Sequence, residues 1–194
     1  EIINQKCHDL KYQIHAIGQT SGVSNATIKE MENIIRIYDC QVKTGNKALD
    51  VILTEKSLLC GKKGINLTCI IDGDKLSFMS EADIYSLFGN AIDNAIEAVS
   101  DLEEDKKVIG VTVKTIRGFL SINLHNHYEK EIVFESGLPI TTKSDKNYHG
   151  FGIKSIKSIC DKYGGDLSIK CENHVFNLNL LFSADQIGAH FAEE

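Results

Sequence analysis

The segment from Glu81 to Ser100 constrains the fold of this chain more than any other stretch. Its apolar residues recur at intervals of three and four, which predicts a helix with one continuous buried face. These residues are Ile84, Leu87, Phe88, Ala91, Ile92, Ala95, Ile96 and Val99. A face of that length has to be covered by another layer of structure. We therefore expect this helix to pack against a sheet.

The opposite face of the same predicted helix carries Asn90, Asp93, Asn94 and Glu97. Their spacing predicts one column of side-chain oxygens. Asn in a helix interior costs roughly 0.5 kcal/mol relative to Ala, and an ordinary solvated face usually carries Glu, Lys and Gln instead. Mg²⁺ prefers such oxygen ligands and takes only one or two from protein when phosphates and water supply the rest. The column therefore favours a magnesium–phosphate site.

A second candidate site lies in TTKSDKNYHGFGIKSIKSIC, residues 141–160. Gly150 and Gly152 precede a predicted helix whose isoleucines are spaced by three. Glycines let backbone amides approach an anion, and a helix N-terminus carries about half a positive charge. Lys143 adds a cation just upstream. A Gly-x-Gly pair alone more often marks a turn or a helix end, but beside the asparagine column it favours phosphate binding.

The same patterns predict the other elements of this domain. They are a helix over 46–60 stopped by Gly61 and Gly64, a strand over 65–71, a turn at Asp72-Gly73 leading to a short strand over 76–79, strands near 107–117 and 119–125, a long loop over 126–149, a helix over 150–163, and a terminal hairpin of LSIKC with VFNLNLLF. This order predicts a mixed sheet with helices on one face, an α/β sandwich of the α+β class.

The first 45 residues follow a different pattern. Apolar residues spaced 4, 3, 4, 3 over residues 1–17, and 3, 4, 3, 4 over residues 28–42, predict two helices that form an antiparallel hairpin ending at Gly45. Such a hairpin cannot enclose its own apolar stripe. The stripe packs either on the following domain or on a second hairpin in a four-helix dimer, and the sequence leaves both open.

Composition excludes several classes. The 194 residues contain 27 acidic and 21 basic side chains, a net charge of −6, without the basic stripe that nucleic-acid binding requires. The six cysteines include no CxxC pair, which favours reduced structural thiols. His125, His127 and His149 lack acidic or cysteine partners at ligand spacing, so we expect no metal there. No stretch approaches the length of apolar sequence that a membrane span needs, and the first residues lack the basic-then-apolar pattern of a signal peptide. Because residue 1 already lies in a helical pattern, we expect any membrane attachment in a missing upstream segment.

With these motifs in place, the chain resembles the GHKL ATP-binding superfamily shared by DNA gyrase, a heat-shock chaperone, a mismatch-repair protein and sensor histidine kinases. It is most similar to the kinase branch of Gram-positive bacteria that includes peptide-pheromone receptors. FGNAIDNAIEAV resembles the N box, HGFGIKSI the second glycine box, and CHDLKYQI the phosphoacceptor box. The resemblance implies a Bergerat-type ATP-binding domain over 46–183, a dimerising hairpin with the phosphoacceptor over 1–45, and a tail over 184–194.

By this resemblance His8 is the phosphoacceptor and Asp9 its acidic neighbour. Histidine must be neutral to attack phosphorus, and an adjacent carboxylate can hold the Nδ1 proton while Nε2 attacks. His15 occupies the same heptad position but is followed by Ala16, which makes it a poorer candidate.

The resemblance also implies a set of residues that bind ATP and Mg²⁺. They are Asn94 as the magnesium ligand, Asn90 and Asp93 beside it, Gly150 and Gly152 as the glycines that hold the phosphates, and Lys143 in the lid. Most of the superfamily reads adenine with an Asp-x-Gly-x-Gly segment. This chain has LHNHYEK, with Asn126 at the comparable strand end, a departure known in the branch.

These assignments imply a magnesium-dependent protein-histidine kinase of two-component signal transduction. It would transfer phosphate from ATP to His8 and then to an aspartate of a response regulator. The chain would be the cytoplasmic portion of a membrane-anchored, homodimeric bacterial sensor. The altered glycine box keeps an alternative open, a non-catalytic ATP-binding regulatory or scaffolding module. An ATPase of the gyrase type is less well supported, because those enzymes place a carboxylate base where this chain has Asn90.

Overall fold

The computed structural model of the chain describes residues 42–135, 137–139 and 151–183. Its elements are α3 (Lys47–Lys62), β1 (Asn66–Ile71), a 3₁₀ helix η1 (Gly73–Leu76), α4 (Glu81–Val99), η2 (Glu104–Lys106), β2 (Val108–Ile116), β3 (Phe119–His127), β4 (Phe134–Glu135), β5 (Leu138–Pro139), α5 (Phe151–Lys162), β6 (Asp166–Glu172) and β7 (Val175–Ser183). The chain divides between Val42 and Lys43 into two units, and these elements belong to the second. The tail over 184–194 and most of the predicted hairpin over 1–45 lie outside the described residues.

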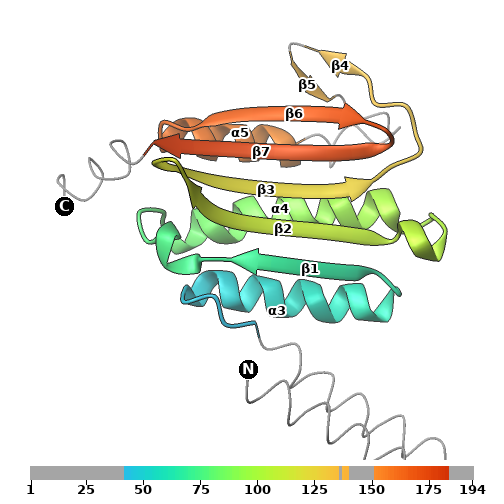
Figure 1. Cartoon of the computed structure of the whole chain (residues 1–194), viewed down its shortest axis with the longest axis horizontal. Coiled ribbons are helices and arrows are strands. Elements are labelled where there is room, and N and C mark those ends of the chain that lie inside the picture. The colour runs from blue at the N-terminus through green and yellow to red at the C-terminus, as the bar shows by residue number, and fades with distance from the viewer. Residues whose placement is uncertain (1–41, 136, 140–150, 184–194) are drawn as a thin grey trace, which may run out of the picture. The chain divides into compact units, whose positions relative to one another are not determined.

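Five strands form one mixed sheet in the order β1-β2-β3-β7-β6. β1 runs parallel to β2, and the remaining neighbours are antiparallel. Figure 1 shows α3, α4 and α5 on the same side of this sheet, with α4 behind its central strands. The predicted mixed sheet with helices on one face is confirmed.

The core lies between the central strands and α4. The side chains of β2, β3 and β7 that face the helices are almost fully buried. They are Ile109, Val111, Val113, Leu120, Ile122, Leu124, Leu178, Leu180 and Phe182. Every residue predicted for the apolar face of α4 is at most 5 % exposed, which confirms that face. Burial alternates along β3, and none of the described helices packs on the other face of the sheet.

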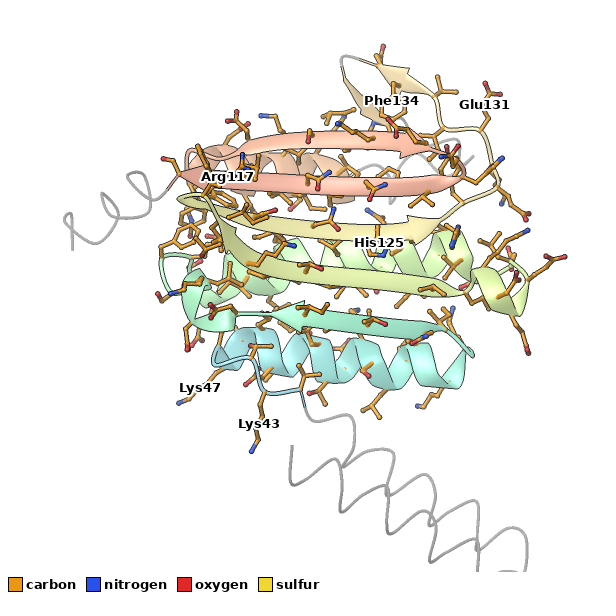
Figure 2. The ribbon with its side chains drawn as sticks, in the orientation of Figure 1. Lys43, Lys47, Arg117, His125, Glu131 and Phe134 are labelled. Atoms are coloured by element: carbon orange, nitrogen blue, oxygen red, sulfur yellow. The ribbon has the colours of Figure 1, made fainter. Side chains whose placement is uncertain are left out.

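The uncovered face of the sheet is polar at its centre. His125 lies on this face (Figure 2), and a Cβ on Gly110 of β2 would overlap its ring, so the glycine makes room for the imidazole. His125 Nδ1 lies 3.3 Å from Asn123 Oδ1, and Asn123 Nδ2 donates to Asn179 Oδ1 at 2.7 Å. Within the described ranges, no group of three or more His, Cys, Asp and Glu side chains could hold a metal ion.

Tight turns join the antiparallel strands where the sequence predicts hairpins. Arg117 and Gly118 both have positive φ (50° and 83°), as do Asn173 and His174 (50° and 60°). Positive φ at both central residues is the signature of the type I′ turn, whose twist matches that of the flanking strands.

The predicted strand over 76–79 is wrong. The chain forms η1 and a turn there, because Leu76, Phe78 and Met79 are all buried, whereas a strand would direct neighbouring side chains to opposite faces. The ring of Phe78 contacts Tyr163 and Phe182 at centroid distances of 5.6 and 5.5 Å.

Two other boundaries differ from expectation. α3 continues through Gly61 to Lys62, and Gly64, with φ of 67°, follows the helix instead of Gly61 ending it. The segment expected to be a loop contains the small hairpin of β4 and β5, with Gly137 at φ of 80°.

The described cysteines are free thiols, as predicted. Cys60 and Cys160 are buried, and Cys69 and Cys171 are half-buried. Burial raises the pKa of Cys60, Cys69 and Cys160 to about 11, so these thiols stay protonated at neutral pH. Cys7 and Cys40 lie outside the described residues. None of the described helices is long and apolar enough to cross a membrane.

A polar cluster fastens the start of α4 to the end of α5. Tyr163 Oη accepts from the Ser80 backbone N–H at 3.0 Å and donates to Asp83 Oδ2 at 2.6 Å. Lys162 Nζ also donates to Asp83 Oδ2, at 2.6 Å. Hydrogen bonds from Lys162, Tyr163 and Ser80 lower the pKa of Asp83 to about 2, so its carboxylate is charged at neutral pH.

Tyr163→Phe is therefore expected to destabilise the domain by about 1–2 kcal/mol, because the buried hydroxyl makes a charge-assisted bond. Thermal unfolding followed by circular dichroism measures the change, and a midpoint about 3–6 °C lower is expected for a domain of this size. Tyr85→Phe is the matched control, since the Tyr85 hydroxyl bonds Glu55 at the exposed surface. An equal or larger decrease in that control would contradict the role of the cluster.

Candidate functional site

The first turn of α5 lies directly against the polar side of α4. A Cβ placed on Gly152 would lie 3.2 Å from Asn94 Nδ2, 3.4 Å from Asn94 Oδ1 and 3.7 Å from Asn90 Oδ1. A side chain at position 152 would therefore crowd the Asn94 amide, whereas its distance to Asn90 Oδ1 would be that of an ordinary van der Waals contact. The structure brings together three predicted site residues from segments far apart in the sequence.

The Asn90 side chain is oriented by its own helix. Its Nδ2 donates to the Ser86 carbonyl at 2.7 Å and to Ser86 Oγ at 3.2 Å. Ser86 Oγ in turn lies 3.3 Å from Ser155 Oγ on α5. With its amino group engaged in this way, Asn90 presents its oxygen near Gly152, while the Asn94 side chain is exposed to solvent.

Asp93 differs from expectation. Its carboxylate binds Lys56 of α3, with Lys56 Nζ 2.8 Å from Oδ1 and 3.0 Å from Oδ2. Residues 93 and 94 project roughly 100° apart on a helix, and α4 has a neighbouring helix on each flank. The expected single column of oxygens is thus split: Asn90 and Asn94 lie against α5, and Asp93 lies against α3.

Asn126 is near the end of β3, on the face of the sheet that the helices cover, and is only 5 % exposed. Its Nδ2 donates to the His127 carbonyl at 2.8 Å. Because a carbonyl oxygen requires a donor opposite it, the orientation of the amide is fixed, and Oδ1 is the atom left to accept a hydrogen bond.

Four predicted site residues lie outside the described residues: His8, Asp9, Lys143 and Gly150. Of the predicted site residues, the structure describes five: Asn90, Asp93, Asn94, Asn126 and Gly152.

Sequence reasoning missed Lys56, the one buried charged side chain of the described ranges. The signal was present, because Lys56 continues the apolar stripe of Leu49, Ile52, Leu53 and Cys60 along α3. A lysine within such a stripe indicates a buried cation that needs a nearby carboxylate.

Comparison with known proteins identifies the family. Residues 79–183 match the family model described as the GHKL domain, which is more than half of the chain. The chain therefore belongs to the GHKL family. No curated protein sequence matches it.

Solved structures of one histidine kinase catalytic domain have the same fold. The catalytic domain of histidine kinase ThkA is similar with a TM-score of 0.54 at 16% sequence identity, over 74% of this chain and 96% of that one. The histidine kinase domain of a blue-light activated kinase from Erythrobacter litoralis gives 0.49 at 11% identity, over 99% of this chain and 97% of that one. The mixed α+β fold is that of histidine kinase GHKL ATP-binding domains.

Proposed function

We propose that this chain is the catalytic portion of a sensor histidine kinase, which binds ATP with Mg²⁺, phosphorylates His8 and passes the phosphoryl group to a response-regulator aspartate. The observation that carries the proposal is the close packing of Gly152 on the Asn94 amide, with Asn90 Oδ1 in contact range beside it. Membership of the GHKL family supports nucleotide binding at this place.

The chemistry of these groups fits magnesium and phosphates. Asn94 would ligate Mg²⁺, with Asn90 beside it, and neutral amides add no charge that would repel a triphosphate. Bound Mg²⁺ would neutralise part of the negative charge of the phosphates. Gly152 in the first turn of α5, and Gly150 just before it in the sequence, would let backbone N–H groups approach the phosphates at the positive end of the helix dipole. Lys143, just upstream in the sequence, would add a cation.

The reaction is an in-line displacement on the γ-phosphorus. Neutral His8 Nε2 forms the new N–P bond while the bond from phosphorus to the bridging oxygen of ADP breaks, and ADP leaves with that electron pair. Asp9 would hold the Nδ1 proton and stabilise the charged phosphoimidazole. An aspartate oxygen of the response regulator then takes the phosphoryl group and restores neutral His8.

The finer assignments belong to the same proposal. Residues 1–45 would form the dimerising hairpin that carries His8, residues 46–183 the ATP-binding domain, and residues 184–194 a tail. The family resemblance favours the Gram-positive peptide-pheromone-receptor branch and a homodimer anchored through an upstream membrane segment.

Incubating the purified chain with Mg²⁺ and ATP radiolabelled on the γ-phosphate tests the proposal. Label that is stable in alkali and lost in acid is expected, because a phosphohistidine bond hydrolyses in acid. Acid-stable label would indicate phosphoserine or phosphothreonine and would contradict the assignment.

A non-catalytic ATP-binding module is the second candidate. The specific observation in its favour is LHNHYEK, which replaces the glycine-rich adenine segment typical of the superfamily. Nucleotide binding without any protein labelling, even with a partner response regulator present, would favour this candidate over the kinase.

Asn126 is expected to select the base. With its Nδ2 held by the His127 carbonyl, Oδ1 can accept a hydrogen bond from the adenine amino group but would repel the carbonyl that guanine has instead. Asn126→Leu is expected to weaken ATP binding about tenfold, since an unpaired buried polar group costs about 1–3 kcal/mol. Asn126→Asp should bind ATP well, because its carboxylate also accepts.

Calorimetric titration with ATP and GTP measures these affinities. Asn123→Leu is the matched control, because Asn123 lies on the same strand but on the uncovered face of the sheet. Unchanged ATP affinity in Asn126→Leu would remove Asn126 from the site.

A further inference from the structure

Lys56 is a buried residue of α3 whose ammonium group contacts α4. Its side chain is 9 % exposed, and it lies in the stripe of α3 that otherwise holds apolar residues. An ammonium group in such a place is strongly destabilising unless a carboxylate compensates it. The partner of Lys56 therefore matters more than the partner of a surface lysine.

That partner is Asp93. Lys56 Nζ contacts both carboxylate oxygens, at 2.8 and 3.0 Å, and lies 3.5 Å from Glu55 Oε1. Burial lowers the pKa of Lys56, but Asp93 and Glu55 outweigh it, and the pKa stands above its ordinary value. Lys56 is therefore a cation at neutral pH and neutralises one carboxylate charge on α4.

The Lys56–Asp93 pair is connected to the candidate site by the position of the Asp93 carboxylate. Asp93 is the direct sequence neighbour of Asn94, and its side chain is 55 % exposed. Without Lys56, a full negative charge would remain within about a Debye length of any phosphate bound at Asn94, roughly 8–10 Å at ordinary salt. Two negative charges at such a separation, here the Asp93 carboxylate and a bound phosphate, repel each other even through water.

We propose that Lys56 is a positioning residue for nucleotide: it neutralises Asp93 and holds this carboxylate on the α3 side of α4, so that the phosphates meet only the neutral amides of Asn90 and Asn94. The inference rests on the proposed function, in which the α4–α5 side binds ATP. It assigns Asp93 an indirect electrostatic role in place of the direct contact expected from the sequence.

A pair that only fastened α3 to α4 would behave differently. Removing either partner would then loosen the domain and weaken every ligand in parallel, whatever its charge. An electrostatic role instead predicts that loss of the cation weakens ATP binding and loss of the carboxylate does not, and that the effect grows with the number of phosphates on the ligand.

The experiment compares adenosine, AMP, ADP and ATP binding to the whole chain by NMR titration in the presence of Mg²⁺. Lys56→Met is expected to weaken ATP about five- to tenfold, from repulsion by unpaired Asp93, and to leave adenosine within about twofold. Asp93→Asn should tighten ATP about twofold or leave it unchanged. The double variant Lys56→Met/Asp93→Asn should return ATP affinity to within about threefold of the parent, because the site is again uncharged.

Lys162→Met is the matched control. Lys162 also pairs with an aspartate of α4, but that residue is Asp83 in the first turn of the helix. Loss of this pair should lower the unfolding midpoint without any effect that depends on phosphate number.

The outcomes separate the two proposals. A parent chain that binds neither ATP nor ADP would overturn the proposed function and this inference with it. If the parent binds ATP normally, the inference alone is overturned when Lys56→Met weakens adenosine and ATP equally, or when both single variants weaken ATP. A folded Lys56→Met variant with parental affinity for all four ligands would also overturn it.

Discussion

Asn94→Ala is expected to abolish magnesium-dependent ATP binding while the domain stays folded. The Asn94 side chain is exposed and lies against Gly152, so its removal opens no core cavity, and Ala is the better helix former. The lost amide oxygen is the proposed magnesium ligand. Affinity for ATP should fall by about 100-fold or more. Substituting a residue that only hydrogen-bonds to a metal ligand already lowers metal affinity by about 10- to 100-fold, and Asn94 is proposed to be a ligand itself.

Calorimetry with ADP and ATP, each with Mg²⁺ and with EDTA, measures this effect. The parent should bind more tightly with Mg²⁺, and Asn94→Ala should show little difference between the two conditions. Glu81→Ala serves as the control, because Glu81 is an exposed residue in the first turn of the same helix. A variant that keeps both its affinity and its response to Mg²⁺ would show that Asn94 is not the ligand.

The helix that carries Asn94 was predictable because its signal is local. A continuous apolar face fixes which side of a helix is buried, and α4 has the buried set that the sequence indicates. The partners of its polar residues were not predictable in the same way. Which neighbouring helix flanks each side depends on the strand order β1-β2-β3-β7-β6, a long-range property that periodicity does not encode.

Because periodicity does not encode long-range packing, the structure differs from the sequence-based prediction at Asp93 and at residues 76–79. Asp93 was grouped with Asn90 and Asn94 by spacing, but α3 offers it a cation and α5 takes the other two residues. Residues 76–79 alternate apolar and polar side chains only in part, and a short pattern of this kind suits a turn that buries three side chains as well as a strand.

Asn126 shows what the sequence did and did not reveal about the site. Comparison of motifs placed an amide at the strand end where the superfamily has a carboxylate. Only the structure supplies the bond to the His127 carbonyl, which fixes the amide with its oxygen as the available acceptor. Orientation of this kind depends on backbone geometry and cannot be read from residue type.

His8→Gln is expected to abolish phosphorylation of the chain without weakening ATP binding. Glutamine is similar to histidine in size and polarity, but its amide nitrogen has no basic lone pair with which to attack phosphorus. Nucleotide affinity should remain because His8 belongs to the predicted hairpin over 1–45, whereas the proposed ATP-binding residues belong to 46–183. The two readouts together separate loss of the acceptor from loss of the nucleotide site.

Labelling with radioactive ATP, run beside calorimetry on the same preparations, tests this expectation. His15→Gln is the matched control, since His15 shares the heptad position of His8 but lacks the following aspartate. Label should persist in that control and disappear in His8→Gln. If the His8→Gln protein is still labelled, the phosphoacceptor is another residue. If label is lost only in His15→Gln, the phosphoacceptor is His15. If His8→Gln also lost ATP affinity, the assignment of His8 to a region separate from the nucleotide site would be wrong.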